Sequence, residues 1–197
     1  MTQWKLDQFC KDKSCIDDAD LYRLDDTLDG LKQDTVLVIH LMGSHGPAYY
    51  QRYPEQYRRF TPTCDTNEIQ DCDHQALMNT YDNTILYTDS VVSRTIDALK
   101  ARQATMNTAL VYLSDHGESL GENGLYLHGT PYMLAPEQQT HIPFMFWLSK
   151  DYKQNFGVDE QCLRDQAAKE TVSQDNLFST VLGMMNIRTT VYQPQMD

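Results

Sequence analysis

The chain has 197 residues, enough for one domain or a large part of one. Its composition, 41% hydrophobic and 22% charged residues, is ordinary for a globular protein. Lys plus Arg total 16 against 28 Asp plus Glu, and the resulting net charge of -12 argues against nucleic-acid binding and against electrostatic docking on an anionic membrane.

No stretch approaches the roughly 20 apolar residues that a membrane-spanning helix needs, and the first residues do not form a secretion signal, so the chain by itself is expected to be soluble. Two cysteine pairs, Cys10 with Cys15 and Cys64 with Cys72, enclose short polar loops and lack Cys-x-x-Cys spacing. This pattern favours two disulfides and an oxidising compartment, with five reduced thiols as the alternative. Cys162 is left without a short-range partner.

The N-terminal third is expected to contain one strand. Residues 1–33 are polar and broken by charges, which indicates loops with short helical turns, and Asp17, Asp18 and Asp20 are interpreted as a solvated turn. Residues 34–41 are β-branched and continuously apolar, which predicts a strand buried on both faces with His40 in the core. The strand ends at the glycine-rich segment around His45.

The remaining residues predict two helices and two strands. A helix is expected over 73–102, with His74 as its cap and one apolar face, and buried strands are expected over 108–113 and 142–148. A final helix over 173–187 is expected to be capped by Ser173. The expected inward residues are Leu77, Tyr81, Ile85, Thr88, Val92, Ile96 and Leu99 in the first helix, and Leu177, Val181, Leu182 and Met185 in the second.

Alternating strands and helices predict an α/β layered domain with a largely parallel sheet. Ligands of such sheets bind at the carboxyl ends of the strands. The segments that carry His45 and the pair Asp115-His116 both follow predicted strand ends, which is where this rule places the chemistry.

Asp115 and His116 are candidate zinc ligands, because a carboxylate oxygen and an imidazole nitrogen are standard donors for this ion. The alternative is an aspartate that caps a turn beside a surface histidine. His45 and His128 are candidates for a metal ligand or a phosphate contact, with a solvated loop histidine as the alternative. Glu118 could orient a ligand or be solvated, and His141 has no evident partner.

Other enzyme classes lose support from the sequence. It contains no Gly-x-Ser-x-Gly elbow, no phosphate-binding P-loop and no Gly-x-Gly-x-x-Gly fingerprint. Hydrolases built on an elbow serine, nucleotide-triphosphate motors and dinucleotide dehydrogenases are therefore disfavoured.

Several motifs together resemble the lipid A phosphoethanolamine transferases, a family that includes the mobile colistin-resistance enzymes. The resemblance extends from about residue 34 to residue 187. It rests on MGSHGP at 42–47, YYQRY at 49–53, FTPTC at 60–64 with Cys72, YDNT at 81–84, SDHGESLGENG at 114–124 and LHG at 127–129.

The resemblance implies an alkaline-phosphatase/sulfatase-like α/β/α sandwich that faces the periplasm and is anchored in the inner membrane by an N-terminal domain of the full-length protein. Asp115 and His116 match two catalytic zinc ligands. His45 and His128 match histidines that contact the phosphoethanolamine group or a second zinc, and Cys64 with Cys72 matches a family disulfide. The implied reaction uses a threonine nucleophile to move phosphoethanolamine from phosphatidylethanolamine to a phosphate of lipid A. The modified lipid A gives resistance to polymyxin and other cationic peptides.

Residues 1–197 are expected to be the C-terminal portion of this catalytic domain, without the membrane domain, because no segment resembles the family's nucleophile region or its further zinc-binding glutamate. The isolated chain is then expected to be inactive and marginally stable, with an exposed sheet edge. Two alternatives remain: another member of the superfamily, such as a sulfatase or phosphoglycerol transferase, or a non-catalytic metal-binding piece. No nucleic-acid or protein partner is inferred.

Overall fold

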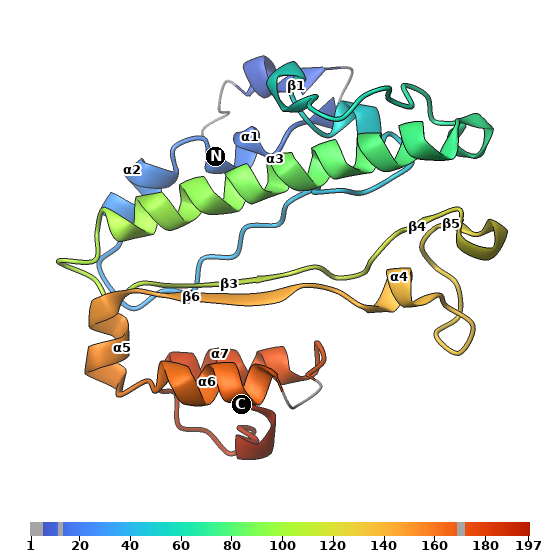
Figure 1. The fold of residues 1–197 in the computed structure, drawn as a ribbon. Coiled ribbons are helices and arrows are strands. Elements are labelled where there is room, and N and C mark those ends of the chain that lie inside the picture. The colour runs from blue at the N-terminus through green and yellow to red at the C-terminus, as the bar shows by residue number, and fades with distance from the viewer. Residues whose placement is uncertain (1–5, 12–13, 169–171) are drawn as a thin grey trace.

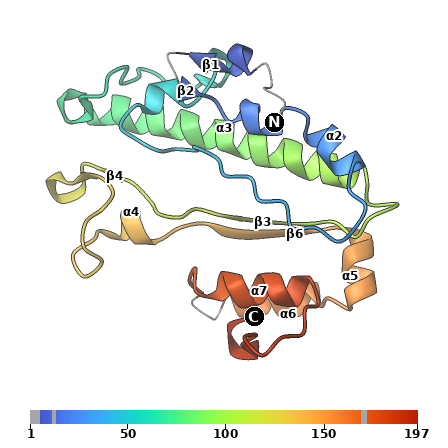
Figure 2. The same cartoon turned by 180° about the vertical axis from the view of Figure 1, so that it is seen from behind.

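The protein is described by a computed structural model that covers residues 6–11, 14–168 and 172–197. Its elements form three layers (Figures 1 and 2). The long helix α3, His74–Lys100, lies on one side, and the strands β3, Ala109–Leu113, and β6, Phe144–Leu148, lie in the middle. The helices α6, Glu160–Ala167, and α7, Asn176–Met184, lie on the other side. This arrangement confirms the predicted α/β class and the α/β/α layering.

The other elements are short. Those before α3 are η1 Asp7–Phe9, β1 Cys10–Lys11, β2 Ser14–Cys15, α1 Asp18–Leu21, α2 Leu24–Asp29, η2 Tyr49–Gln51, η3 Glu55–Tyr57 and η4 Ile69–Asp71. Those after β3 are β4 Ser119–Leu120, η5 Glu122–Gly124, β5 Tyr126–Leu127, α4 Glu137–Thr140, α5 Lys150–Phe156, α6 Glu160–Ala167, α7 Asn176–Met184 and η6 Pro194–Met196. No helix in the described ranges is long and apolar enough to cross a bilayer.

Helix α3 begins where the sequence supplies a cap. The carboxylate of Asp73 accepts hydrogen bonds from the amides of Gln75 and Ala76, which satisfies two of the donors that a helix start leaves open. His74 is therefore the first helical residue, and the prediction that it caps the helix is wrong. The helix runs 27 residues, close to the predicted 73–102.

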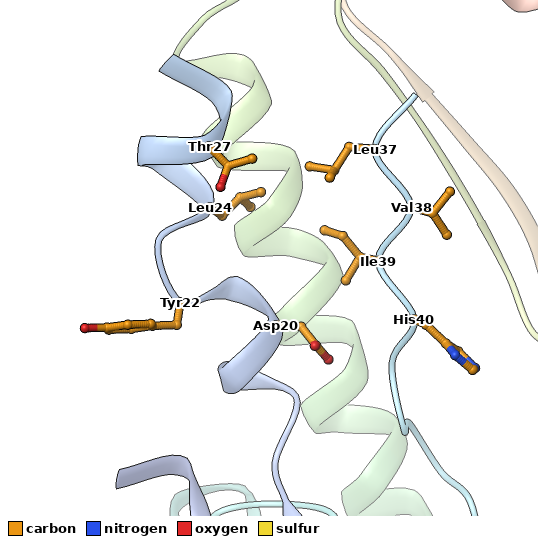
Figure 3. Close-up of a pocket in the computed structure, with 8 residues that line it drawn as sticks. All are labelled: Asp20, Tyr22, Leu24, Thr27, Leu37, Val38, Ile39 and His40. Atoms are coloured by element: carbon orange, nitrogen blue, oxygen red, sulfur yellow. The ribbon is translucent and has the colours of Figure 1, made fainter. Parts of the chain in front are cut away.

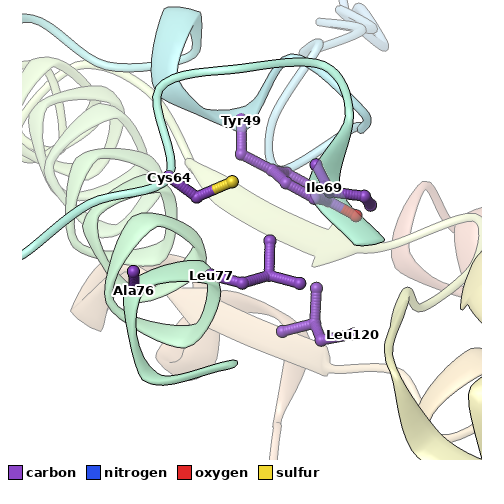
Figure 4. Close-up of a cluster of buried hydrophobic side chains, with 6 residues drawn as sticks. All are labelled: Tyr49, Cys64, Ile69, Ala76, Leu77 and Leu120. Carbon is purple, nitrogen blue, oxygen red and sulfur yellow. The ribbon is translucent and has the colours of Figure 1, made fainter. Parts of the chain in front are cut away.

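The main core lies between the start of α3, residues 49–72 and β4 (Figure 4). Tyr49, Cys64 and Ile69 come from residues 49–72, Ala76 and Leu77 come from α3, and Leu120 comes from β4. Full burial of a side chain such as Leu77 is worth about 1.5–3 kcal/mol. The cluster therefore fixes β4 and the first turns of α3 against one another.

The buried face of α3 overlaps the predicted one only in part, and Tyr81, Ile96 and Leu99 are half-buried. Leu77, Thr88 and Val92 are buried as expected, but Ile85 is 47% exposed. The buried stripe also includes polar side chains, because loop backbone groups pack against the helix and need partners: Thr80 accepts from the amide of Cys64, and Asn83 accepts from the amides of Arg59 and Phe60. Apolar periodicity does not detect such positions.

Strands β3 and β6 pair antiparallel, from Ala109 with Leu148 to Leu113 with Phe144. Both predicted strands are present, but the prediction of a largely parallel sheet is wrong, since the strand pairs in the described residues are all antiparallel. The connection from β3 to β6 contains a hairpin and α4 and turns the chain back on itself. The prediction of buried strands is also wrong, because β3 is half-buried and Met145 and Phe146 of β6 are exposed.

The predicted strand over 34–41 is not formed. These residues are extended but have no ladder partner among the described residues, and most are exposed, including His40, which was expected in the core. Their side chains still alternate (Figure 3): Leu37 and Ile39 point toward α2 across an open groove, while Val38 and His40 point the other way. The sequence specifies the extended backbone, and a strand also needs a neighbour.

The C-terminal helix is shorter than predicted. It forms α7 with Asp175 at its N-cap, so Ser173 is not the cap. Ser173 instead lies two residues before the N-cap and accepts a hydrogen bond from the amide of Asp175. The residues expected to point inward, Leu177, Val181, Leu182 and Met185, are half-buried.

The N-terminal segment is attached to α3. The disulfides Cys10–Cys15 and Cys64–Cys72 are both present as predicted, and Cys162 is free and exposed. The amide of Asp18 donates to the hydroxyl of Tyr87 on α3, and its carboxylate pairs with Arg94. The prediction of a solvated aspartate turn is wrong for Asp17, which is 4% exposed.

Candidate metal centre

Three histidines from separate loops meet at one point. His45 follows the extended segment 34–41, His116 follows β3 and His128 follows β5, and one nitrogen of each lies within 4.8 Å of the others. The ring centroids of His116 and His128 are 3.9 Å apart, and those of His45 and His128 are 4.9 Å apart. The fold therefore places three imidazoles close enough to share one ion.

Each of the three rings has its Nδ1 atom next to an oxygen acceptor. Nδ1 of His45 lies 2.7 Å from the carbonyl of Gly46, Nδ1 of His116 lies 3.0 Å from the carbonyl of Gly117, and Nδ1 of His128 lies 3.1 Å from Oε1 of Glu118. In a neutral ring this contact assigns the proton to Nδ1 and leaves the lone pair of Nε2 free. Metal-binding histidines are oriented by the same kind of contact.

Glu118 joins two of the histidine loops. Its side chain is 4% exposed, and its carboxylate accepts from the amide of Gly46 and the hydroxyl of Tyr49, besides its contact with His128. The register of the β4–β5 hairpin explains the position, because Ser119 pairs with Leu127 and Glu118 is therefore opposite His128. Of the two interpretations of Glu118 from the sequence, the orienting role is the one that the structure supports.

Two tyrosines surround this carboxylate. Burial, together with the nearby charge of Glu118, raises the pKa of Tyr49 far above its usual range and raises the pKa of Tyr81 to about 12. Their rings pack edge to face, with centroids 5.5 Å apart. Tyr49 is therefore neutral at any physiological pH, and its hydroxyl donates to Glu118.

Asp115 lies at the edge of the histidine cluster. Its side chain is 78% exposed, and its Oδ1 is 3.8 Å from Nε2 of His116. The group of metal-ligating atoms found among the described residues contains His45, His116 and His128 without Asp115. The sequence paired Asp115 with His116 as ligands, and the structure places them next to each other with His45 and His128 close by.

Asp17 binds the backbone of the loop that carries His45, on the N-terminal side of this histidine. Its carboxylate accepts from the amides of Met42 and Gly43 at 2.8 and 3.0 Å. On the other side of His45, Nε of Arg52 donates to the carbonyl of His45. Burial raises the pKa of Asp17, and the two backbone hydrogen bonds and Arg52 oppose that effect.

Glycines permit two close approaches in the site. A Cβ at Gly117 would lie 1.9 Å from the carbonyl oxygen of Gln138, so the segment between His116 and Glu118 fits against α4 only without a side chain. A Cβ at Gly46 would lie 2.5 Å from the side chain of Leu127. The glycine after His45 and the one after His116 therefore let the three loops converge.

This set of donors suits zinc. Three imidazole nitrogens with a carboxylate beside them match the ligand types of zinc sites, in which three protein ligands leave a position open for chemistry. Asp17 was missed from the sequence, where nothing distinguishes it from a solvated aspartate. Glu118 was considered there, but its pairing with His128 was not predicted. Glu118 lies three residues before and His128 four residues after the glycine-rich turn at 121–124, so a predicted hairpin would have brought them together.

Comparisons with known proteins agree with this geometry. The sulfatase family model matches residues 2–187. The chain is 54% identical over 197 residues to the phosphoethanolamine transferase EptA of Salmonella typhimurium and covers 36% of that protein. It is also 48% identical over 134 residues to the phosphatidylethanolamine transferase Mcr-2 of Escherichia coli, which spans 68% of this chain and 25% of the relative.

A third relative is the Kdo(2)-lipid A phosphoethanolamine 7''-transferase of Escherichia coli K12, 37% identical over 153 residues, which is 76% of this chain and 26% of the relative. The chain thus spans about a third or less of these curated relatives, and the resemblance to phosphoethanolamine transferases predicted from its motifs is confirmed.

Solved structures share the fold. The integral membrane protein lipooligosaccharide phosphoethanolamine transferase A of Neisseria meningitidis superposes with a TM-score of 0.94 at 48% identity, over 98% of this chain and 36% of that one. The periplasmic domain of EptC from Escherichia coli, solved in complex with Zn, gives a TM-score of 0.77 at 26% identity, over 95% of this chain and 52% of that one.

Proposed function

The chain belongs to the sulfatase family, and from that premise we propose that it forms part of the catalytic domain of a zinc-dependent enzyme that transfers phosphoethanolamine from phosphatidylethanolamine to a phosphate of lipid A. The observation that carries the proposal is the convergence of His45, His116 and His128, each with Nε2 free. The names of the relatives contain the transferred group, phosphoethanolamine, and the acceptor, lipid A, and the donor lipid is part of the proposal.

We assign a separate role to each group of residues in the site. Asp115 and His116 would hold zinc, and His45 and His128 would bind the transferred phosphoryl group or complete a metal shell. Bound zinc would supply a Lewis acid that stabilises charge on the phosphoryl oxygens and lowers the pKa of a coordinated hydroxyl. Glu118 fixes the ring of His128 and the backbone before Tyr49, so these donors keep their positions as charge develops on the phosphate.

The nucleophile is proposed to come from the full-length protein, called the parent protein below. Two-step transfer needs a hydroxyl that attacks the donor phosphorus and releases diacylglycerol, and then yields the phosphoethanolamine to lipid A. The sequence contains no segment like the family's nucleophile region, and the chain spans 36% of the Salmonella relative. We therefore place this hydroxyl outside the 197 residues, with the membrane domain.

The proposed location is the periplasmic side of the inner membrane. Two disulfides fit an oxidising compartment, and the names of the solved relatives describe an integral membrane protein and a periplasmic domain. Adding an ethanolamine amine to a lipid A phosphate offsets negative charge, which weakens the attraction of cationic peptides such as polymyxin.

Zinc titration of the chain by calorimetry tests the proposed centre. We expect His116→Ala to abolish binding and Glu118→Gln to weaken it by about 10–100-fold, because the orienting acceptor of His128 is altered. His141→Ala is the matched control, since this exposed histidine lies outside the cluster and should leave binding unchanged. Equal binding by all variants would reject the site.

Transfer is tested in the parent protein. Phosphatidylethanolamine and lipid A are supplied, and diacylglycerol release and modified lipid A are followed by mass spectrometry. We expect His45→Ala and His128→Ala to lose both products and His141→Ala to retain them. Turnover of an aryl sulfate in place of phosphatidylethanolamine would favour a sulfatase instead. Zinc binding by the chain without transfer by the parent would leave it a non-catalytic metal-binding unit.

A further inference from the structure

Next to the histidine cluster, residues 131–136 form a loop whose tip is apolar and exposed. Tyr132, Met133 and Leu134 are 84%, 94% and 74% exposed. Among the other large apolar residues of the described ranges, only Val38, at 81%, is exposed to a similar degree. Single exposed apolar side chains are common, whereas three adjacent ones form a small contiguous apolar patch.

The loop has a defined turn. The amides of Leu134 and Ala135 both donate to the carbonyl of Pro131, at 2.7 and 2.9 Å. Prolines at 131 and 136 restrict the backbone at both ends of the loop. The exposed side chains are therefore presented by an ordered structure, which lowers the entropy cost of binding through them.

The base of the loop is attached to the candidate metal centre. The amide of Thr130 donates to Oε1 of Gln139 at 3.2 Å, and Nε2 of Gln139 donates to Oγ of Ser119 at 2.8 Å. The carbonyl of Gln139 also accepts from the amide of Gly117, beside His116. Gln139 is buried, and its hydrogen bonds hold the base of the loop against the segments that carry His116 and Ser119.

The charge pattern favours a lipid partner. Residues 123–136 contain no Asp, Glu, Lys or Arg, in a chain of net charge -12. A tyrosine next to two aliphatic side chains, without charge, suits the interfacial layer of a bilayer. Three side chains expose a few hundred Å² at most, whereas a stable protein interface buries about 800 Å² on each partner.

From these observations we infer that the 131–136 loop is a membrane-contact loop. It places Tyr132, Met133 and Leu134 in the interfacial layer of a phospholipid bilayer, and its attachment through Gln139 holds the histidine cluster near the lipid phosphates. The inference rests on the proposed function for the identity of the donor, a phospholipid, while the contact itself requires no catalysis.

Flotation with vesicles of phosphatidylethanolamine and phosphatidylcholine tests the loop, with a chelator present so that zinc has no part. Replacing Tyr132, Met133 and Leu134 with serine should weaken binding by on the order of tenfold or more. The matched control replaces Val38, Phe178 and Val191, which are exposed apolar residues elsewhere, and should bind like the unchanged chain. Circular dichroism checks that both variants keep the fold.

A tryptophan variant gives a second readout that does not depend on lost binding. Brominated lipids should quench the emission of Met133→Trp more than that of the unchanged chain, which contains Trp4 and Trp147, and should not do so for the control Phe178→Trp. The inference is overturned if the chain does not bind vesicles, if both serine variants bind equally, or if binding requires anionic phosphatidylglycerol. It is also overturned if Met133→Trp in the parent protein, reconstituted in a bilayer that contains brominated lipids, is not quenched.

The two proposals fail separately. His128→Ala should bind vesicles like the unchanged chain, because His128 belongs to the metal centre and not to the loop tip. Zinc binding that persists in the serine variant while vesicle binding is lost would support both proposals. Vesicle binding without zinc binding would support the loop and reject the proposed centre.

Discussion

Two buried carboxylates organise the candidate site. Glu118 contacts the loops of His45 and His128 at once, and Asp17 supports the backbone before His45 from the N-terminal segment. Both belong to residue types that are usually solvated, so each pays for its burial with hydrogen bonds. Substitution of either carboxylate would therefore displace a histidine, even though the carboxylate itself need not contact a substrate.

The burial of Asp17 predicts a dependence of stability on pH. Because its folded-state pKa lies above the ordinary value of 3.8, the protonated form is favoured in the folded chain. Its contribution to stability is therefore fully present below the unfolded value and is lost as pH rises through the folded value. The free energy of unfolding of the unchanged chain relative to Asp17→Asn should fall over that range.

Chemical denaturation at several pH values measures this difference. Asp17→Asn should also cost about 1–3 kcal/mol, because its side chain keeps one acceptor for two backbone amides. Asp34→Asn removes the same charge at an exposed position and serves as the control for net charge. A constant difference between the unchanged chain and Asp17→Asn across pH would contradict the argument.

Two elements do most of the positioning. Helix α3 provides one wall of the main core, and the β4–β5 hairpin brings His128 back beside Glu118. The length and the start of α3 follow from its periodicity and from Asp73, both visible in the sequence. Its buried face does not, because Asn83 and Thr80 are buried by loop amides that the sequence does not place.

The burial of α3 predicts unequal effects of two similar substitutions. Leu77→Ala should reduce the free energy of unfolding by about 2–5 kcal/mol, because it leaves a cavity in the main core. Ile85→Ala, which follows the sequence prediction of an inward residue, should cost less than about 1 kcal/mol because the side chain is half in solvent. If urea unfolding shows equal losses of free energy of unfolding for the two variants, Ile85 is an inward residue as the sequence predicts.

At the scale of the whole molecule, the three layers are present but the middle layer is thin. Only β3 and β6 form its paired core among the described residues, and the extended segment 34–41 runs between α3 and β3 without a ladder (Figure 1). Val36, Leu37 and Val38 are exposed there. An extended apolar segment with free backbone groups is a template for another strand.

This arrangement predicts different hydrogen exchange in the chain and in the parent protein. Amides of residues 36–39 should exchange rapidly in the 197-residue chain and be protected in the parent, where a neighbouring strand would pair with them. The amides of β3 that bond to β6 should be protected in both and provide the internal control. The chain alone should unfold at low denaturant, and a sharp transition with a high midpoint would contradict the expected marginal stability.

The sequence by itself determined what depends on local pattern and on short motifs: the α/β class, the extent of α3, the positions of β3 and β6, both disulfides and the family resemblance. The tertiary structure alone decided which groups meet: the burial of Asp17 and Glu118, the antiparallel pairing, the exposed state of 34–41 and the grouping of His116 with His45 and His128. The physical reason is the separation along the sequence of the residues that interact. Periodicity and capping are set by residues a few positions apart, whereas burial, strand pairing and metal-ligand geometry are set by contacts between segments that are distant in the chain.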